Sequence, residues 1–121
     1  MAAELPQSMT AIGLDAPGGP EVLRPESLPV PAAGAGEVLI QVAFAGVNRP
    51  DVVQRKGLYP PPPGASQVPG LEISGHVVAI GDGVDPEMLG QAVCALVTGG
   101  GYAQYCLAKA AHCLRVPASL S

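Results

Sequence analysis

Three observations predict a mainly β fold, a barrel or a sandwich, for this chain of 121 residues. Short apolar segments recur along the chain and are separated by turn sequences, which is typical of all-β domains. The 16 glycines and 14 prolines form no repeat, so frequent turns account for them better than low complexity does. Hydrophobic residues make up 48% of a chain long enough for one domain, which suffices for an aliphatic core.

The N-terminal part predicts two extended segments joined by a turn. Residues 9–14 form a short apolar run. The run ends at residues 16–20, Ala-Pro-Gly-Gly-Pro, a sequence that favours a turn. Residues 22–28 are a possible second strand, and we expect a loop over residues 29–36.

Residues 37–46 are the clearest strand of the sequence, because apolar side chains recur at every second position. Val38, Ile40, Val42 and Phe44 share one face of such a strand. β-Branched residues dominate this set, so we expect this face, including Phe44, to meet the core.

One short helix is predicted directly after this strand. Asn48 is a suitable N-cap, Pro50 and Asp51 suit the first turn, and Gly57 suits the C-terminal stop. Arg55 and Lys56 would then lie in the last turn, where the helix dipole favours positive charge. Two turns are too few for a stable isolated helix, so tertiary packing must sustain it.

The second half of the sequence predicts further strands. The loop that begins at Tyr59 is stiffened by four prolines at 60–63. The glycine run 99–101 lacks the Lys-Ser/Thr pair of a phosphate-binding loop, so we expect a tight hairpin there. The predicted strands are residues 73–80, 91–97 and 102–107, with a last extended piece at 114–117.

Charge and composition exclude several function classes. The net charge is −4, the six basic residues are scattered, and aromatic residues are few, so we expect no nucleic-acid partner. No apolar run approaches the ~18 residues of a membrane span, so we expect no membrane partner. The start of the sequence does not resemble a signal peptide, and the three cysteines form no even framework, so we expect a reduced, cytoplasmic protein.

Several segments in one order carry a family resemblance. They are residues 16–20, 38–51, 57–60, 69–75, 90–93 and 100–105. Together they resemble the medium-chain dehydrogenase/reductase superfamily over nearly the whole chain, from about residue 9 to residue 119. The segment 16–20 is typical of its quinone oxidoreductase branch, to which zeta-crystallin belongs.

The resemblance implies a chaperonin-10-like (GroES-like) fold, a partly open β-barrel with one or two short helices, as a catalytic and substrate domain over residues 1–121. In the family a Rossmann domain follows and holds most of the cofactor, and this sequence contains no such unit. The intact parent is therefore expected to be an NADPH:quinone oxidoreductase that transfers a hydride to a quinone or an activated enone. We expect it to be a homo-oligomer, and the 121-residue chain to be inactive by itself.

The main alternative is a self-contained β-barrel module that binds or scaffolds without catalysis. The two hypotheses differ in what the gene encodes after Ser121. A reading frame that continues into a strand and a Gly-x-Gly-x-x-Gly turn would favour the oxidoreductase. A stop codon at that point would favour the module.

The resemblance also implies that no metal is bound. Zinc-dependent relatives carry a cysteine at the position of Asn48 and a histidine at the position of Leu71. Leucine cannot ligate zinc, and Glu72 alone cannot hold it tightly. This departure from the alcohol dehydrogenases favours the metal-free quinone reductases.

Four candidate site residues follow from the resemblance. Asn48 would lie near the nicotinamide, and Tyr59 matches a family tyrosine that reaches the cofactor or the substrate. Both also have simpler interpretations, as a helix N-cap and as a loop tyrosine packed on prolines. Asp51 matches an acid that supports the metal site in zinc relatives, and here a first-turn structural role is favoured. Glu72 is either a cleft residue or a buried acid that needs a partner such as Arg49 or Arg55.

Overall fold

The computed structural model describes residues 5–14, 16–58, 60–63, 65–117 and 119. These residues form a mainly β structure, as predicted, and contain one α-helix and three short 3₁₀ helices. The strands are β1 (Ser8–Leu14), β2 (Leu23–Pro29), β3 (Glu37–Ala45), β4 (Glu72–Ile80), β5 (Ala92–Leu96), β6 (Tyr105–Lys109) and β7 (Cys113–Arg115). The helices are α1 (Arg49–Arg55), η1 (Pro20–Val22), η2 (Pro86–Met88) and η3 (Ala110–His112).

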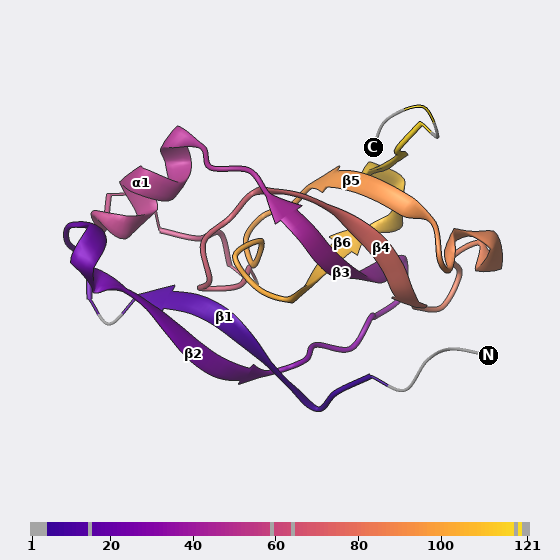
Figure 1. Cartoon of the computed structure of the whole chain (residues 1–121), viewed down its shortest axis with the longest axis horizontal. Helices are drawn as coiled ribbons and strands as arrows, with labels where there is room; N and C mark the ends of the chain where they lie inside the picture. Colours follow the sequence, from indigo (N-terminus) through magenta and orange to yellow (C-terminus); the bar gives the residue numbers. More distant parts are fainter. Residues whose placement is uncertain (1–4, 15, 59, 64, 118, 120–121) are drawn as a thin grey trace.

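The strands form two open antiparallel sheets (Figure 1). β1 and β2 pair with each other, and the larger sheet has the order β6-β3-β4-β5-β7. A bridge between Ala11 and Ala103 joins β1 to the segment that precedes β6. The predicted partly open, mainly β architecture is therefore confirmed, with α1 inserted between β3 and β4.

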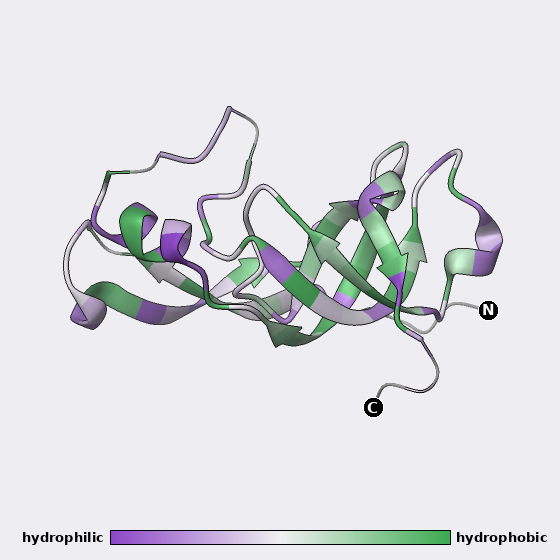
Figure 2. Cartoon of the chain, turned by 90° about the horizontal axis from the view of Figure 1, so that it is seen from above, coloured by the Kyte–Doolittle hydropathy of each residue, from purple (hydrophilic) through white to green (hydrophobic). Residues whose placement is uncertain are grey.

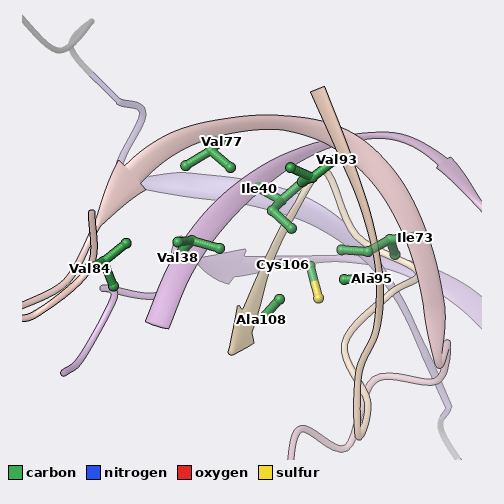
Figure 3. Close-up of a cluster of buried hydrophobic side chains, with 9 residues drawn as sticks. All are labelled: Val38, Ile40, Ile73, Val77, Val84, Val93, Ala95, Cys106 and Ala108. Atoms are coloured by element: carbon green, nitrogen blue, oxygen red, sulfur yellow. The ribbon is translucent and has the colours of Figure 1, made fainter. Parts of the chain in front are cut away.

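The core lies on the inner face of the larger sheet (Figure 3). Val38 and Ile40 of β3 are fully buried there, beside Ile73 and Val77 of β4. Every member of the cluster is aliphatic or a cysteine, as the shortage of aromatic residues requires. Figure 2 shows that hydrophobic residues line much of this sheet. The cluster consists of Val38, Ile40, Ile73, Val77, Val84, Val93, Ala95, Cys106 and Ala108.

The prediction that Phe44 faces the core is wrong. Its side chain is 76% exposed, although Val42 is partly buried against the core. Val42 pairs with Gly75 and Phe44 pairs with Ser74, so one extra β3 residue separates two consecutive partners on β4. Such a bulge changes the face on which the following side chain lies, and the simple alternation therefore fails beyond Val42.

The predicted hairpin at the glycine run is also wrong. β5 pairs with β4 and β7, whereas β6 pairs with β3 at the opposite edge of the sheet. The glycine run therefore crosses from one side of the sheet to the other. Gly100 donates its N–H to Val68 O (2.7 Å), and Gly101 donates to Gly70 O (3.0 Å). These two N–H groups are already bonded, which argues against a phosphate cradle at this point.

Tertiary contacts sustain α1, as its short length requires. The helix lies beside the connection between β1 and β2 (Figure 1). Gly18 donates its N–H to Arg55 O (2.9 Å), and Arg55 Nε donates to Gly18 O (3.1 Å). On another side, the buried Gln54 donates its Nε2 to Gln67 O (3.1 Å). The helix is thereby fixed to two loops, and its first residue follows Asn48 directly.

Candidate active site

Asn48 lies at the junction between β3 and α1. It is half-buried and has an extended backbone, with φ −130° and ψ 159°, as expected for an N-cap. Gly46 donates its N–H to Glu72 O (2.8 Å), so the junction lies next to the first residue of β4. The structure thus brings Asn48 and Glu72, two of the predicted site residues, together across 24 positions of sequence.

Asp51 is the buried acid of this group. Its side chain is only 5% exposed, and its Oδ2 accepts two hydrogen bonds, from the Asn48 backbone N–H (3.0 Å) and from the Tyr102 hydroxyl (2.5 Å). Its Oδ1 is buried and has no hydrogen-bond partner among the described residues. Because a buried carboxylate is costly without donors, these two bonds to Oδ2 are what stabilises it.

Glu72 is not a buried acid, so it does not need an arginine partner. It is exposed, and its Oε1 accepts a hydrogen bond from Asn48 Nδ2 (3.0 Å). Arg55, one of the two expected partners, instead bonds Gly18 O. The carboxylate of Glu72 therefore orients the Asn48 amide and stays accessible to solvent.

Tyr102 belongs to this group although sequence reasoning did not select it. Burial, followed by the hydrogen bond and the negative charge of Asp51, raises the pKa of Tyr102 above its usual value of 10.0. The phenol therefore stays a protonated donor at neutral pH. Its place directly after the glycine run was the available sequence signal, but only the fold brings it to Asp51, 51 positions away.

Tyr59, the other predicted catalytic residue, lies outside the described residues. Its role, like those of Asn48, Asp51 and Glu72 in catalysis, stays a prediction. In the described part of the chain, no three His, Cys, Asp or Glu side chains are grouped so that they could hold a metal ion. Leu71, which stands where a zinc ligand would be needed, is half-buried beside Glu72.

A hollow in the structure lies away from these residues. It has a volume of about 470 Å³ and is lined by Met9, Leu28, Val68 and Cys106 among others, but by none of Asn48, Asp51, Glu72 and Tyr102. Burial raises the pKa of the Cys106 thiol to about 12. A thiol that stays protonated is a poor nucleophile, so this hollow has no activated cysteine.

Comparison with known proteins identifies the family. Residues 34–118 match the alcohol dehydrogenase GroES-like domain. The chain belongs to this family. The chain is 38% identical over 114 residues to a quinone oxidoreductase of Lama guanicoe, and 39% identical over 101 residues to one of Rattus norvegicus. These matches cover 93% and 82% of this chain but 34% and 31% of the relatives, so the chain spans about one third of their length.

Solved structures give the same result. The human synaptic vesicle membrane protein VAT-1 homolog-like protein aligns with a TM-score of 0.86 at 32% identity, over 94% of this chain and 37% of that protein. Mycobacterial Rv1454c complexed with NADPH aligns with a TM-score of 0.80 at 35% identity, over 93% and 34%. None of the described helices is both long and apolar enough to cross a membrane.

Proposed function

We propose that this GroES-like domain is the catalytic domain of an NADPH-dependent quinone oxidoreductase that needs no metal. The relatives named quinone oxidoreductase and the structural neighbour complexed with NADPH support this proposal. The observation that carries it is the fixed position of Asn48, whose side-chain Nδ2 donates to Glu72 and whose backbone N–H donates to the buried Asp51. The proposal concerns the intact protein, of which this domain supplies one part.

The polar groups around Asn48 fit a nicotinamide. A nicotinamide carboxamide offers one carbonyl acceptor and one NH₂ donor. The amide nitrogen of Asn48 carries two hydrogens, so it can donate to Glu72 and to one further carbonyl oxygen. The exposed Glu72 carboxylate can accept an N–H in return. NADPH, when bound, supplies the hydride, and the side chains named here bind and orient it.

Reduction of a quinone or an enone makes few demands on such a site. The acceptor is already electrophilic, so the protein needs mainly to align two planar groups and to exclude competing reactions. Asn48 and Glu72 can orient the carboxamide without gaining or losing a proton. Leucine at position 71 offers no ligand to a metal, which agrees with chemistry that requires none.

Tyr59 is proposed to contact the cofactor or the acceptor through its ring and hydroxyl. If the hydroxyl only positions these groups, Tyr59→Phe should lower turnover by ~10-fold, and Tyr59→Ala should lower it further because the stacking ring is lost as well. Steady-state NADPH oxidation by the intact protein measures both effects. Unchanged turnover in a folded Tyr59→Ala variant would exclude this role.

The proposed function is tested with the intact protein that contains this domain. We expect saturable oxidation of NADPH with 1,4-benzoquinone, at the same rate before and after treatment with a chelator. A rate no faster than the enzyme-free reaction would refute the proposal and favour the non-catalytic module. A loss of activity on chelation that added zinc restores would refute the metal-free mechanism alone.

A further inference from the structure

We propose that Tyr102 is a positioning residue, which holds Asn48 in place through Asp51. The inference rests on the proposed function, since it assumes that the Asn48 amide meets the nicotinamide or the acceptor. Tyr102 lies within the segment 100–105 that carries the family resemblance, but the sequence analysis gave it no role. Its assignment comes from three hydrogen bonds that link Tyr102, Asp51, Asn48 and Glu72 in a row.

The first link is the rigid placement of Tyr102. Its backbone N–H donates to Pro69 O (2.9 Å), and its carbonyl accepts from the Ile12 N–H (2.8 Å). Its ring lies against Gly70, where an added Cβ would come within 2.8 Å of Tyr102 Cδ1. Two segments that are distant in sequence, one at Ile12 and one at residues 69–70, thus fix this residue. A phenol on a fixed backbone has only two side-chain torsions, so its hydroxyl has little freedom.

The second link is the single oxygen through which Asp51 acts. Oδ2 accepts both the Tyr102 hydroxyl and the Asn48 N–H, whereas the buried Oδ1 has no partner among the described residues. If the hydroxyl is removed, the Asn48 N–H is the one remaining donor that the described residues give this carboxylate. A buried carboxylate short of donors turns toward water when it can, and Asn48 would then lose its own partner.

The third link is the orientation of Asn48. Asp51 holds its backbone N–H and Glu72 holds its side-chain Nδ2, so both the position and the direction of the amide are determined. A displacement of about 1 Å at a positioning group can cost on the order of a hundredfold in rate. Partial loosening through Asp51 should cost less, because the bond to Glu72 remains.

The experiment compares Tyr102→Phe with Tyr105→Phe in the intact protein. Tyr105 is a half-buried tyrosine of β6 whose hydroxyl has no hydrogen-bond partner among the described residues, and its variant serves as the matched control. We expect Tyr102→Phe to lower kcat by ~10-fold with KM for NADPH changed by less than about threefold, since positioning acts mainly in the transition state. Tyr105→Phe should leave kcat unchanged.

A double-mutant cycle separates positioning from a general loss of structure. An Asn48→Ala background contains no side-chain amide for Tyr102 to position. In this background Tyr102→Phe should therefore lower kcat by less than about twofold. The same loss in both backgrounds, or an unchanged kcat in Tyr102→Phe alone, would overturn the inference.

Hydrogen exchange gives a measurement that does not depend on activity. The backbone amide of Asn48 should exchange at least ~10-fold faster in Tyr102→Phe than in the parent or in Tyr105→Phe, because its acceptor is loosened. If the parent protein does not reduce quinones, the proposed function fails, and this exchange rate still decides whether Tyr102 holds Asn48. Equal exchange in the parent and both variants would refute the positioning role.

Discussion

At the scale of single residues, Asp51 contributes both to the stability of the fold and to the arrangement of the candidate site. Its carboxylate satisfies the N–H of Asn48 ahead of the helix and accepts the hydroxyl of Tyr102, while the side chain is almost fully buried. The acid is also in the first turn of α1, where the helix dipole favours negative charge. A residue that the family resemblance links to a metal site thus has a structural role in this chain, as the acceptor of two hydrogen bonds.

Truncation of Asp51 should therefore destabilise the protein. Asp51→Ala leaves the Tyr102 hydroxyl and the Asn48 N–H without an acceptor, and we expect the free energy of unfolding to fall by about 1–3 kcal/mol. Chemical denaturation measures it. Asp85→Ala is the control, because Asp85 also accepts a backbone N–H (Glu87, 2.9 Å) but is exposed, and its loss should cost less. Equal costs for the two variants would contradict the assigned role of Asp51.

Cys106 should be protected from alkylation. Its side chain is buried, and burial raises the pKa of the thiol from 9.0 to about 12, so almost no thiolate forms at pH 8. We expect native Cys106 to react with iodoacetamide at least ~100-fold more slowly than in urea. Because the folded protein holds this proton more tightly, the thiol's contribution to stability is full below pH 9 and declines as the pH rises toward 12. Mass spectrometry that finds Cys106 alkylated as fast as the half-buried Cys94 would exclude the expected protection of Cys106.

At the scale of elements, the pairing of β3 with β4 depends on close backbone approach. Gly75 pairs with Val42 at the bulge, and an added Cβ there would lie 2.0 Å from Gln41 O. The obstacle is backbone, which cannot rotate away as a side chain does. The bulge that exposes Phe44 therefore requires a glycine opposite it.

Gly75→Ala should accordingly cost more than an ordinary glycine substitution. We expect a loss of ~3 kcal/mol in the free energy of unfolding, from the forced separation of β3 and β4. Gly83→Ala is the control, because Gly83 has a positive φ of 81° but nothing within 4 Å of the added Cβ, and strain alone should cost ~1 kcal/mol. Thermal denaturation that ranks Gly83→Ala as the more destabilising change would contradict this account.

At the scale of the whole molecule, one face of the larger sheet carries exposed apolar side chains beside polar ones. Phe44, Ser74, Cys94 and Leu114 are paired in register across β3, β4, β5 and β7, so their side chains share a face. Phe44 is 76% exposed and Leu114 is 69% exposed, and Leu96 on the same face of β5 is exposed as well. In isolation, this surface should favour self-association of the 121-residue chain.

The isolated chain should bind NADPH weakly. Its described residues provide the polar groups around Asn48, but the N–H groups of Gly100 and Gly101 are bonded within the fold and are not free for phosphate. We expect a Kd about a thousandfold weaker than that of the intact protein, a difference of about 4 kcal/mol, because we propose that another part of the intact protein makes the main phosphate and ribose contacts. Calorimetry with residues 1–121 tests this, and micromolar binding would contradict it.

Much of the local structure could be predicted because its signals are local. Alternating apolar residues located β3 within one residue, and Asn48, Pro50 and Gly57 marked the limits of α1 through caps and fixed torsions. The motif order also gave the family, which the match of residues 34–118 confirms.

The rest depended on contacts between distant segments. The bulge beside Gly75 turned Phe44 outward, and the strand order sent the glycine run across the sheet, although neither feature has a signal within a few residues. The site shows the same division. Asn48, Asp51 and Glu72 were identified by their motifs, but Tyr102 meets Asp51 across 51 positions only because backbone pairing places both there. Local sequence signals were therefore enough to predict the main strands, the α-helix and the family, whereas the packing of those elements decided which side chains face each other.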